Sequence, residues 1–207
     1  MQVVLDDYVW AAGIATDLIN TTAEVWQGDD HLPDLAALVA FADLHDHHER
    51  DEQGRRGLSE LARRARPADL RAVRDLRATV RDLIDRPEHG HLVAGASALT
   101  SAIGGATLVP ESAQEHRAHW AVSLRPEATV FDALSLICGV GILGVVHTLG
   151  AGRFRSCGAP TCRGAFIDTT RPGRRRYCMP GLCGTRINVA NHRARQAAVR
   201  GPDSATE

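Results

Sequence analysis

The 207-residue chain contains no lysine, so arginine supplies all 24 of its basic side chains. Aromatic residues are scarce at 4% of the sequence, and only five cysteines are present. The absence of lysine indicates a compositional preference and explains why arginine is used as the basic residue. It does not explain why the arginines are distributed unevenly along the chain.

Several catalytic signatures are also missing. The chain has no G-x-S-x-G nucleophile turn, no H-E-x-x-H metalloprotease motif and no phosphate-binding loop. Its first residues lack the basic-then-apolar pattern of a secretory signal peptide. We therefore expect a protein that is not an enzyme and that works in the reducing cytoplasm, where cysteines stay available for a metal.

Charge divides the chain into an acidic part and a basic part. Between Ala151 and Arg200 there are eleven arginines and one acid, Asp168, which gives a net charge of +10. Residues 1–150 hold thirteen arginines and twenty-two acids, a net charge of −9. The overall charge of −1 conceals this asymmetry, and the basic part predicts a polyanionic partner.

Four cysteines of the basic part have the spacing C-x4-C-x15-C-x4-C: Cys157, Cys162, Cys178 and Cys183. Two close pairs separated by a loop are typical of a tetrahedral zinc site with four sulfur ligands. Because four thiolates leave no open coordination position, we expect one structural Zn²⁺ and no metal-bound water for catalysis.

The residues around the cysteines predict a treble-clef-like zinc finger over residues 151–200. Ala165–Thr169 and Arg174–Cys178 are interpreted as the two strands of a hairpin, joined by a turn with proline and glycine at its centre. Cys183 then begins a helix that continues to the end of this segment. The polar tail 201–207 is predicted to be disordered.

Basic and amide side chains of this zinc finger are the predicted DNA contacts. They are Arg174, Arg175 and Arg176 in the hairpin, and Arg186, Asn188, Arg193 and Arg195 on the helix. Arginine suits phosphates and guanine, and asparagine suits adenine. We expect duplex DNA because the segment offers few aromatics for stacking on bases, and the two candidates, Phe166 and Tyr177, are expected to pack inside the small fold. Two alternatives stay open: an RNA-binding zinc module, and a protein-interaction adaptor whose arginines meet an acidic surface.

Residues 1–150 are expected to form one mainly α-helical domain with a small β-hairpin, which senses a signal or makes a homodimer. The expected elements are helices that begin near Leu35, at Leu58 and at Pro67, a helix over Leu92–Ile103, and strands over Thr107–Val109 and His119–Leu124. Asp17 and Asn20 lie three residues apart on one helical face. They are weak candidates for contacts to an unknown small-molecule effector, or for capping a buried turn.

Val130–Leu149 is a run of twenty nearly apolar residues, which is the length of a membrane span. Asp132 and His147 lie within it, and three glycines allow close helix packing. We therefore expect the central buried helix of the domain, with Cys138 as a core residue and no membrane partner.

The sequence also resembles two known families. Cys157-x4-Cys162, Arg174–Met179 and Cys183-Gly184-Thr185-Arg186 are similar to the CGNR zinc finger, with Thr185 where that family has Asn. More weakly, Thr16–Thr21 resembles the Leu-Asp-Phe-x-Asn-Thr-like stretch of the helical ABATE domain. The resemblance implies a transcription regulator of the stress-induced type, with a DNA-binding zinc end and a helical sensing end.

Overall fold

The computed structural model describes residues 1–46, 57–110 and 118–185, together with residues 187, 189, 193 and 196. Its helices are α1 (Tyr8–Ile19), α2 (Leu35–His45), α3 (Leu58–Arg63), α4 (Pro67–Asp85), α5 (His89–Leu99) and α6 (Val130–Leu149). Its strands are β1 (Gln2–Val4), β2 (Ile103–Pro110), β3 (Ala118–Leu124), β4 (Phe154–Ser156) and β5 (Ala165–Ile167). The described chain is therefore mainly α with small sheets, as predicted.

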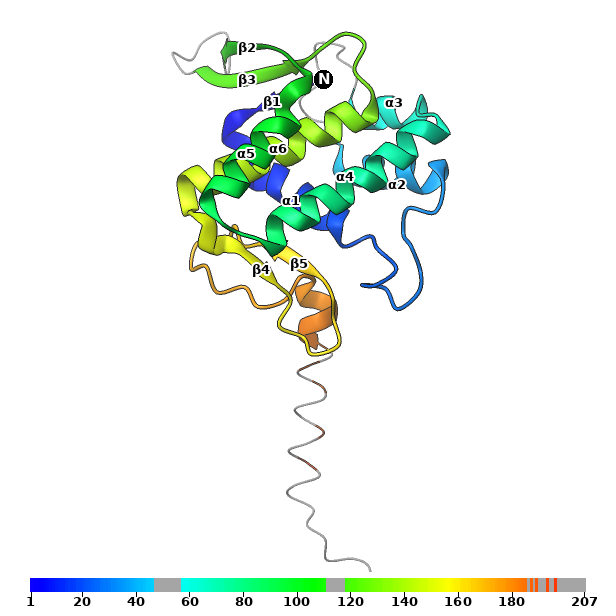
Figure 1. Ribbon diagram of the computed structural model, residues 1–207, viewed down its shortest axis with the longest axis vertical. Helices are drawn as coiled ribbons and strands as arrows, with labels where there is room; N and C mark the ends of the chain where they lie inside the picture. Colours follow the sequence, from blue (N-terminus) through cyan, green and yellow to red (C-terminus); the bar gives the residue numbers. More distant parts are fainter. Residues whose placement is uncertain are drawn as a thin grey trace, which may run out of the picture.

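Helix α6 is the centre of the larger core, and α1, α4 and α5 pack around it (Figure 1). Glycines permit this approach, since a Cβ at Gly141 would lie 2.5 Å from the backbone nitrogen of Ala12 in α1. A Cβ at Gly139 would lie 2.9 Å from the carbonyl oxygen of Ala96 in α5. By length and composition α6 could cross a membrane, but 72% of its most apolar stretch is buried in the protein. It is the core helix that the sequence predicted.

Helices α2, α3 and α4 also agree with the prediction, and their first turns show why they begin where they do. The Asp34 carboxylate accepts a hydrogen bond from the backbone nitrogen of Ala37 (2.8 Å) and caps α2. In α4, Pro67 occupies the first turn, and Asp69 accepts from the backbone nitrogen of Arg66 (2.7 Å). The face of α4 that turns to the core consists of Leu70, Val73, Leu76, Val80, Leu83 and Ile84.

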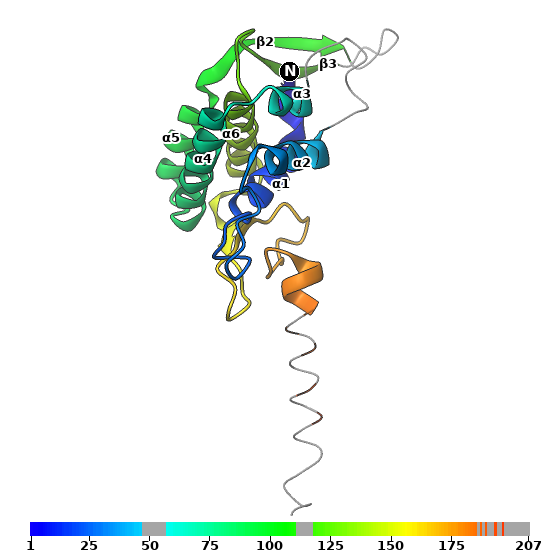
Figure 2. The same cartoon turned by 90° about the vertical axis from the view of Figure 1, so that its right-hand side faces the viewer.

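A three-stranded antiparallel sheet has the strand order β1-β3-β2. Strands β2 and β3 are the predicted hairpin, and β1 was not predicted because three residues carry too little pattern. The predicted helix Leu92–Ile103 lies too far along the chain: α5 begins at His89 and ends at Leu99, and Ile103 already pairs with Leu124 in the sheet. This sheet and the zinc-finger segment lie at opposite ends of the helices (Figures 1 and 2).

The hairpin of the basic segment differs from the predicted one. Strand β5 pairs with β4, so that Arg155 lies opposite Phe166, and the predicted strand over Arg174–Cys178 is wrong. The physical reason is that the Arg175 backbone nitrogen donates to the Asp168 carboxylate (3.0 Å) and not to a strand. The turn between them also closes one residue earlier than expected, with a hydrogen bond from Gly173 N to Thr170 O (3.0 Å).

The β4–β5 hairpin has one face in each of two apolar cores. Phe154, Ala165 and Ile167 join the core of the helical region, whereas Phe166 on the opposite face is buried among the cysteines. Strand β5 contacts α1 and α4, and β4 contacts α4. The packing therefore runs without a break from the helical region into the β4–β5 hairpin.

Candidate metal centre

Two tight turns carry the four cysteines. Cys157 follows directly after β4, and the turn behind it closes with hydrogen bonds from Cys157 N to Gly164 O (2.8 Å) and from Cys162 N to Ala159 O (3.0 Å). The second turn, Pro180–Gly184, contains Cys183, whose backbone nitrogen donates to Met179 O (2.8 Å). A hydrogen bond from Gly158 N to Arg176 O (2.8 Å) joins the first turn to the segment that leads into Cys178, and brings the pairs of thiols together.

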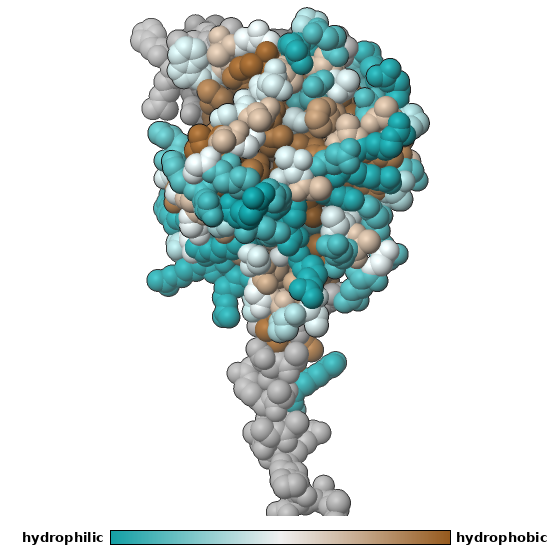
Figure 3. Space-filling view, viewed as in Figure 1, coloured by the Kyte–Doolittle hydropathy of each residue, from teal (hydrophilic) through white to brown (hydrophobic). Residues whose placement is uncertain are grey.

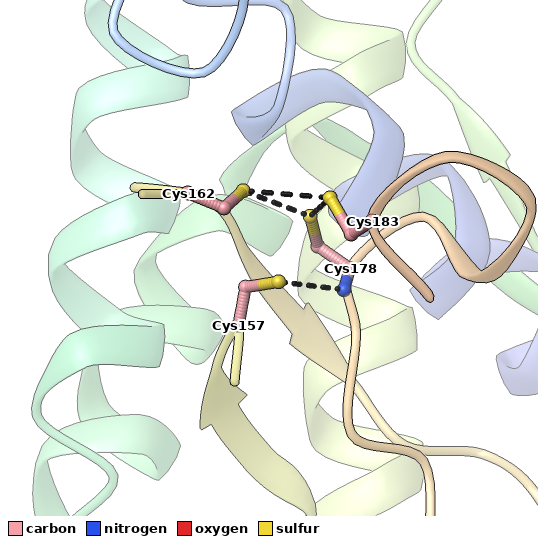
Figure 4. A group of neighbouring side chains, drawn as sticks. All are labelled: Cys157, Cys162, Cys178 and Cys183. Carbon is pink, nitrogen blue, oxygen red and sulfur yellow. Dashed lines mark hydrogen bonds between the residues drawn. The ribbon is translucent and has the colours of Figure 1, made fainter. Parts of the chain in front are cut away.

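The four sulfur atoms converge on one point (Figure 4). The Sγ atom of Cys178 lies 3.6 Å from that of Cys162 and 3.8 Å from that of Cys183, and the last two are 3.7 Å apart. All four lie within 4.8 Å of one another. A tetrahedron with Zn–S bonds of about 2.3 Å has edges of about 3.8 Å, whereas a disulfide bond is about 2.05 Å long. The spacing fits one tetrahedral zinc ion and not a pair of disulfides.

Burial makes the site dependent on a cation. Cys178 and Cys183 are 2% and 4% exposed, and burial raises the pKa of both thiols in the metal-free protein, that of Cys183 to about 11. Backbone N–H groups donate hydrogen bonds to two of the sulfur atoms: Gly164 N lies 3.3 Å from Cys162 Sγ, and Cys178 N lies 3.4 Å from Cys157 Sγ. A bound Zn²⁺ supplies the remaining charge that four adjacent thiolates require. The four cysteines hold one structural zinc.

Cys138 is a different kind of residue. It lies inside α6 with 0% of its surface exposed, and burial raises its pKa to about 12. Such a thiol is inert at neutral pH. Cys138 is a core residue, as the sequence predicted.

A small apolar core supports the metal ligands. Phe166 is completely buried there together with Ala159, and Tyr177, Met179 and Ile187 pack against it. A Cβ at Gly184 would lie 3.2 Å from the Tyr177 ring. The glycine of the Cys-Gly-Thr-Arg sequence is thus the surface on which this tyrosine packs.

Asp168, the single acid of residues 151–200, is a structural centre of the module. It has 0% of its surface exposed, and one carboxylate oxygen accepts from both the backbone nitrogen (3.0 Å) and the hydroxyl (2.5 Å) of Thr170. The other oxygen accepts from Arg175 N (3.0 Å) and from the Arg155 guanidinium (3.3 Å). Burial opposes ionisation, but these donors together hold the pKa of Asp168 below its ordinary value.

The three consecutive arginines have two different roles. Arg174 and Arg176 are exposed. Arg175 is half-buried: its guanidinium lies over the Phe166 ring (4.8 Å to the centroid) and donates to the carbonyl oxygens of Tyr177 (2.9 Å) and Cys178. Burial lowers the pKa of Arg175, and neighbouring acids offset this. Donors of Arg175 are thus used inside the protein, and its role as a phosphate contact stays a prediction.

The remaining predicted contacts lie on the helix after Cys183. Thr185, Ile187, Val189, Arg193 and Gln196 are helical, and Arg193 is exposed. Arg186, Asn188 and Arg195 lie outside the described residues.

Asp17 lies in the last turn of α1, and Asn20 directly follows that helix. The Asn20 side chain is 5% exposed and hydrogen-bonded to the backbone of β5. Asp17 Oδ2 lies 3.6 Å from His45 Nε2. Burial raises the pKa of Asp17, and the charges of His45 and Arg175 partly offset that rise. Asn20 thus connects the end of α1 to the zinc finger, whereas Asp17 lies beside α2, and a ligand role for the pair stays a prediction.

Sequence reasoning missed several residues that build the site. Arg153 Nη1 donates to Thr170 O (2.7 Å), Arg155 Nη1 to Gly173 O (2.9 Å), and Arg81 of α4 to Arg163 O (2.6 Å). Many arginines were counted as one basic surface, although these three bind carbonyl oxygens within the protein. The one available signal was Asp168, since a lone acid among eleven arginines indicates an internal partner.

Comparison with known families agrees with this geometry. The CGNR zinc finger model matches residues 153–196, which contain all four cysteines. The ABATE model, described as "Putative stress-induced transcription regulator", matches residues 13–142, more than half of the chain. A search of curated proteins finds no match. These descriptions are of a zinc-containing regulator and not of an enzyme. The chain belongs to the ABATE family, and a CGNR zinc finger follows its helical region.

Proposed function

We propose that this protein is a zinc-dependent, DNA-binding transcription regulator. Zinc closes the two cysteine turns and holds the basic loops in place, and the helical region senses a signal or makes a homodimer. Reduced thiols are required for such a site, which supports a cytoplasmic location. Four thiolates fill the zinc coordination sphere, which supports a structural metal and a protein that is not an enzyme.

The observation that carries the proposal is the sorting of charge within the zinc finger. The only acid, Asp168, is buried and hydrogen-bonded, while five arginines of the described part are exposed: Arg163, Arg171, Arg174, Arg176 and Arg193. Hydrophilic residues cover much of the face seen in Figure 3, in its lower part as well as elsewhere. An unopposed set of guanidinium groups attracts phosphates and releases the counterions bound to them.

The aromatic residues favour duplex DNA over single-stranded nucleic acid. Sequence-specific RNA binding uses exposed aromatic rings on which unpaired bases stack. In the zinc finger Phe166 is completely buried and Tyr177 packs against the cysteine core. The described helical positions after Cys183 present Arg193 to solvent. In the proposal this helix enters the major groove, and Arg186, Asn188 and Arg195 are further candidate contacts.

Salt dependence of binding tests the proposal. The affinity of the zinc-loaded chain for a labelled duplex is measured by fluorescence anisotropy between about 50 and 200 mM salt, for the wild type and for the double variant Arg174→Ala/Arg176→Ala. The variant should bind more weakly, with a log–log salt slope lower by about 2, because each lost phosphate contact removes about one counterion.

A matched control removes the same charge elsewhere. Arg71 in α4 and Arg125 after β3 are also exposed, so Arg71→Ala/Arg125→Ala changes the net charge equally. If both double variants change the slope equally, binding reflects net charge alone, and the proposed contact surface is wrong. Equal competition by unlabelled RNA and duplex DNA would favour the RNA-binding alternative.

A further inference from the structure

Strand β5 has two edges, and β4 uses only one of them. Along the shared edge Arg155 pairs with Phe166, Cys157 N donates to Gly164 O (2.8 Å), and Asp168 N donates to Arg153 O (2.8 Å). In an antiparallel ladder the backbone groups of alternate residues point in opposite directions. The polar groups of Ala165 and Ile167 therefore point away from β4, and each needs a partner because both residues are buried.

Thr16 of α1 and Asn20, the residue directly after that helix, supply partners for three of these groups. Asn20 Oδ1 accepts from Ala165 N (3.1 Å), and Asn20 Nδ2 donates to Ala165 O (2.7 Å). One helical turn earlier, Thr16 Oγ1 accepts from Ile167 N (3.1 Å). Asn20 is fixed in turn by a bond from Nδ2 to Thr16 O (2.7 Å). Two side chains of α1 thus take the place of a third strand beside β5.

The same contact reaches the metal ligands through one residue. Gly164 precedes Ala165, and its backbone nitrogen lies 3.3 Å from Cys162 Sγ. A Cβ at Gly164 would lie 2.7 Å from Asn20 Oδ1, 3.2 Å from Cys162 Sγ and 2.5 Å from Cys178 Sγ. Only the backbone of Gly164 separates the Asn20 amide from two sulfur ligands, so a shift of Ala165 moves the N–H group that supports one of them.

We propose that Asn20 and Thr16 are positioning residues of the zinc centre. Neither touches the metal; both fix β5, and β5 fixes the Cys162 turn and the Gly164 amide. The helical region and the zinc site then form one unit, in which a change at α1 alters how tightly the metal is held. This inference does not depend on which macromolecule the zinc finger binds.

The first test measures zinc release from the full-length protein into an excess of a chromophoric chelator. Asn20→Ala leaves the N–H and C=O of Ala165 without partners in a buried place, and zinc should leave at least tenfold faster than from the wild type. Asn20→Asp keeps the acceptor but loses the donor, so its rate should be intermediate. Thr16→Val keeps the side-chain volume and loses one acceptor, and should give a smaller increase.

A remote core variant separates positioning from general stability. Leu92 is buried in α5, which packs on α4 and α6, so Leu92→Ala destabilises the helical core without touching β5. If Asn20→Ala releases zinc faster than Leu92→Ala at matched unfolding free energy, positioning is supported. Equal release rates at matched stability would overturn it.

Backbone hydrogen exchange gives a readout that does not use the metal. The Ala165 and Ile167 amides should be protected in the wild-type protein because α1 accepts their hydrogen bonds. Asn20→Ala should speed exchange at Ala165, Thr16→Val at Ile167, and neither at Val122 in β3. If exchange at Ala165 is unchanged by Asn20→Ala, the side chain does not fix β5, and the proposal is wrong.

Discussion

The backbone nitrogen of Arg175 donates a hydrogen bond to the carboxylate of Asp168, 3.0 Å away, and this bond holds the loop between β5 and the third cysteine. The same carboxylate binds Thr170 and the Arg155 guanidinium. With the loop held in this way, the three consecutive arginines alternate in direction: Arg174 and Arg176 face solvent, while Arg175 turns inward onto Phe166. One buried acid thus organises the arginines around it.

Replacing this acid should destabilise the zinc finger. Asp168→Ala leaves several partly buried donors without an acceptor, and we expect the free energy of unfolding to fall by about 2 kcal/mol. Asp168→Asn keeps one carbonyl acceptor and should lose less. Denaturant unfolding followed by circular dichroism measures both values. A loss below about 0.5 kcal/mol in Asp168→Ala would contradict a central role for the carboxylate.

Gly164 should be intolerant of any side chain. A Cβ there would lie 2.5 Å from Cys178 Sγ and 2.7 Å from Asn20 Oδ1. The metal ligand and the end of α1 would both have to move to make room for it. Gly164→Ala should weaken zinc binding at least tenfold, since overpacking costs about 1–3 kcal/mol. The matched control is Gly152→Ala, because nothing lies within 4 Å of a Cβ at that position. Competition with a chelator measures both affinities, and equal values would refute the predicted clash.

The contact between α6 and α1 predicts opposite effects for two glycines. Gly141→Ala would place a methyl group 2.5 Å from Ala12 N and should lower stability by about 1–3 kcal/mol. Gly13 lies on the exposed side of α1 with nothing within 4 Å, so Gly13→Ala should be neutral or stabilise by up to about 1 kcal/mol. Thermal unfolding distinguishes the two, and a neutral Gly141→Ala would contradict the close helix packing.

Acid stability should reveal the ion pair between Asp30 and Arg77. Hydrogen bonds from Arg77 lower the pKa of Asp30 from 3.8 to about 2. A lowered folded-state pKa stabilises the protein above about pH 4, and that contribution is lost as pH falls towards 2.

A variant isolates this contribution from the other effects of acid. Arg77→Gln should be less stable than the wild type by about 1 kcal/mol above pH 4, a modest value because Asp30 is partly exposed, and the difference should shrink at lower pH. Unfolding measured side by side from pH 6 to pH 3 cancels effects that both proteins share. Arg71→Gln on the same helix is the control, and a difference independent of pH would contradict the pairing.

The metal site could be predicted well because the residues that define it lie close together in the sequence. The spacing of Cys157, Cys162, Cys178 and Cys183 is written within 27 residues, and tight turns need no distant partner. Helix α4 was equally clear, since its apolar residues recur at helical spacing over about four turns. The buried helix α6 could also be predicted from local sequence, because it is one run of nearly apolar residues.

Long-range contacts could not be predicted. Asn20 and Ala165 are 145 positions apart, and nothing in either segment indicates that a helix side chain will replace a strand. The inward turn of Arg175 depends on Phe166 and on two carbonyl oxygens that converge only after folding. Three-residue strands such as β1 and β4 are too short for alternation to be recognised.

The most direct test of the central claim is retention of fragmented host genomic DNA on the purified zinc-loaded chain, followed by sequencing. A chelated sample and the Arg174→Ala/Arg176→Ala variant serve as controls. Zinc-dependent DNA binding predicts discrete peaks upstream of genes that weaken in the variant and vanish on chelation. Uniform retention, or peaks that survive removal of zinc, would contradict it.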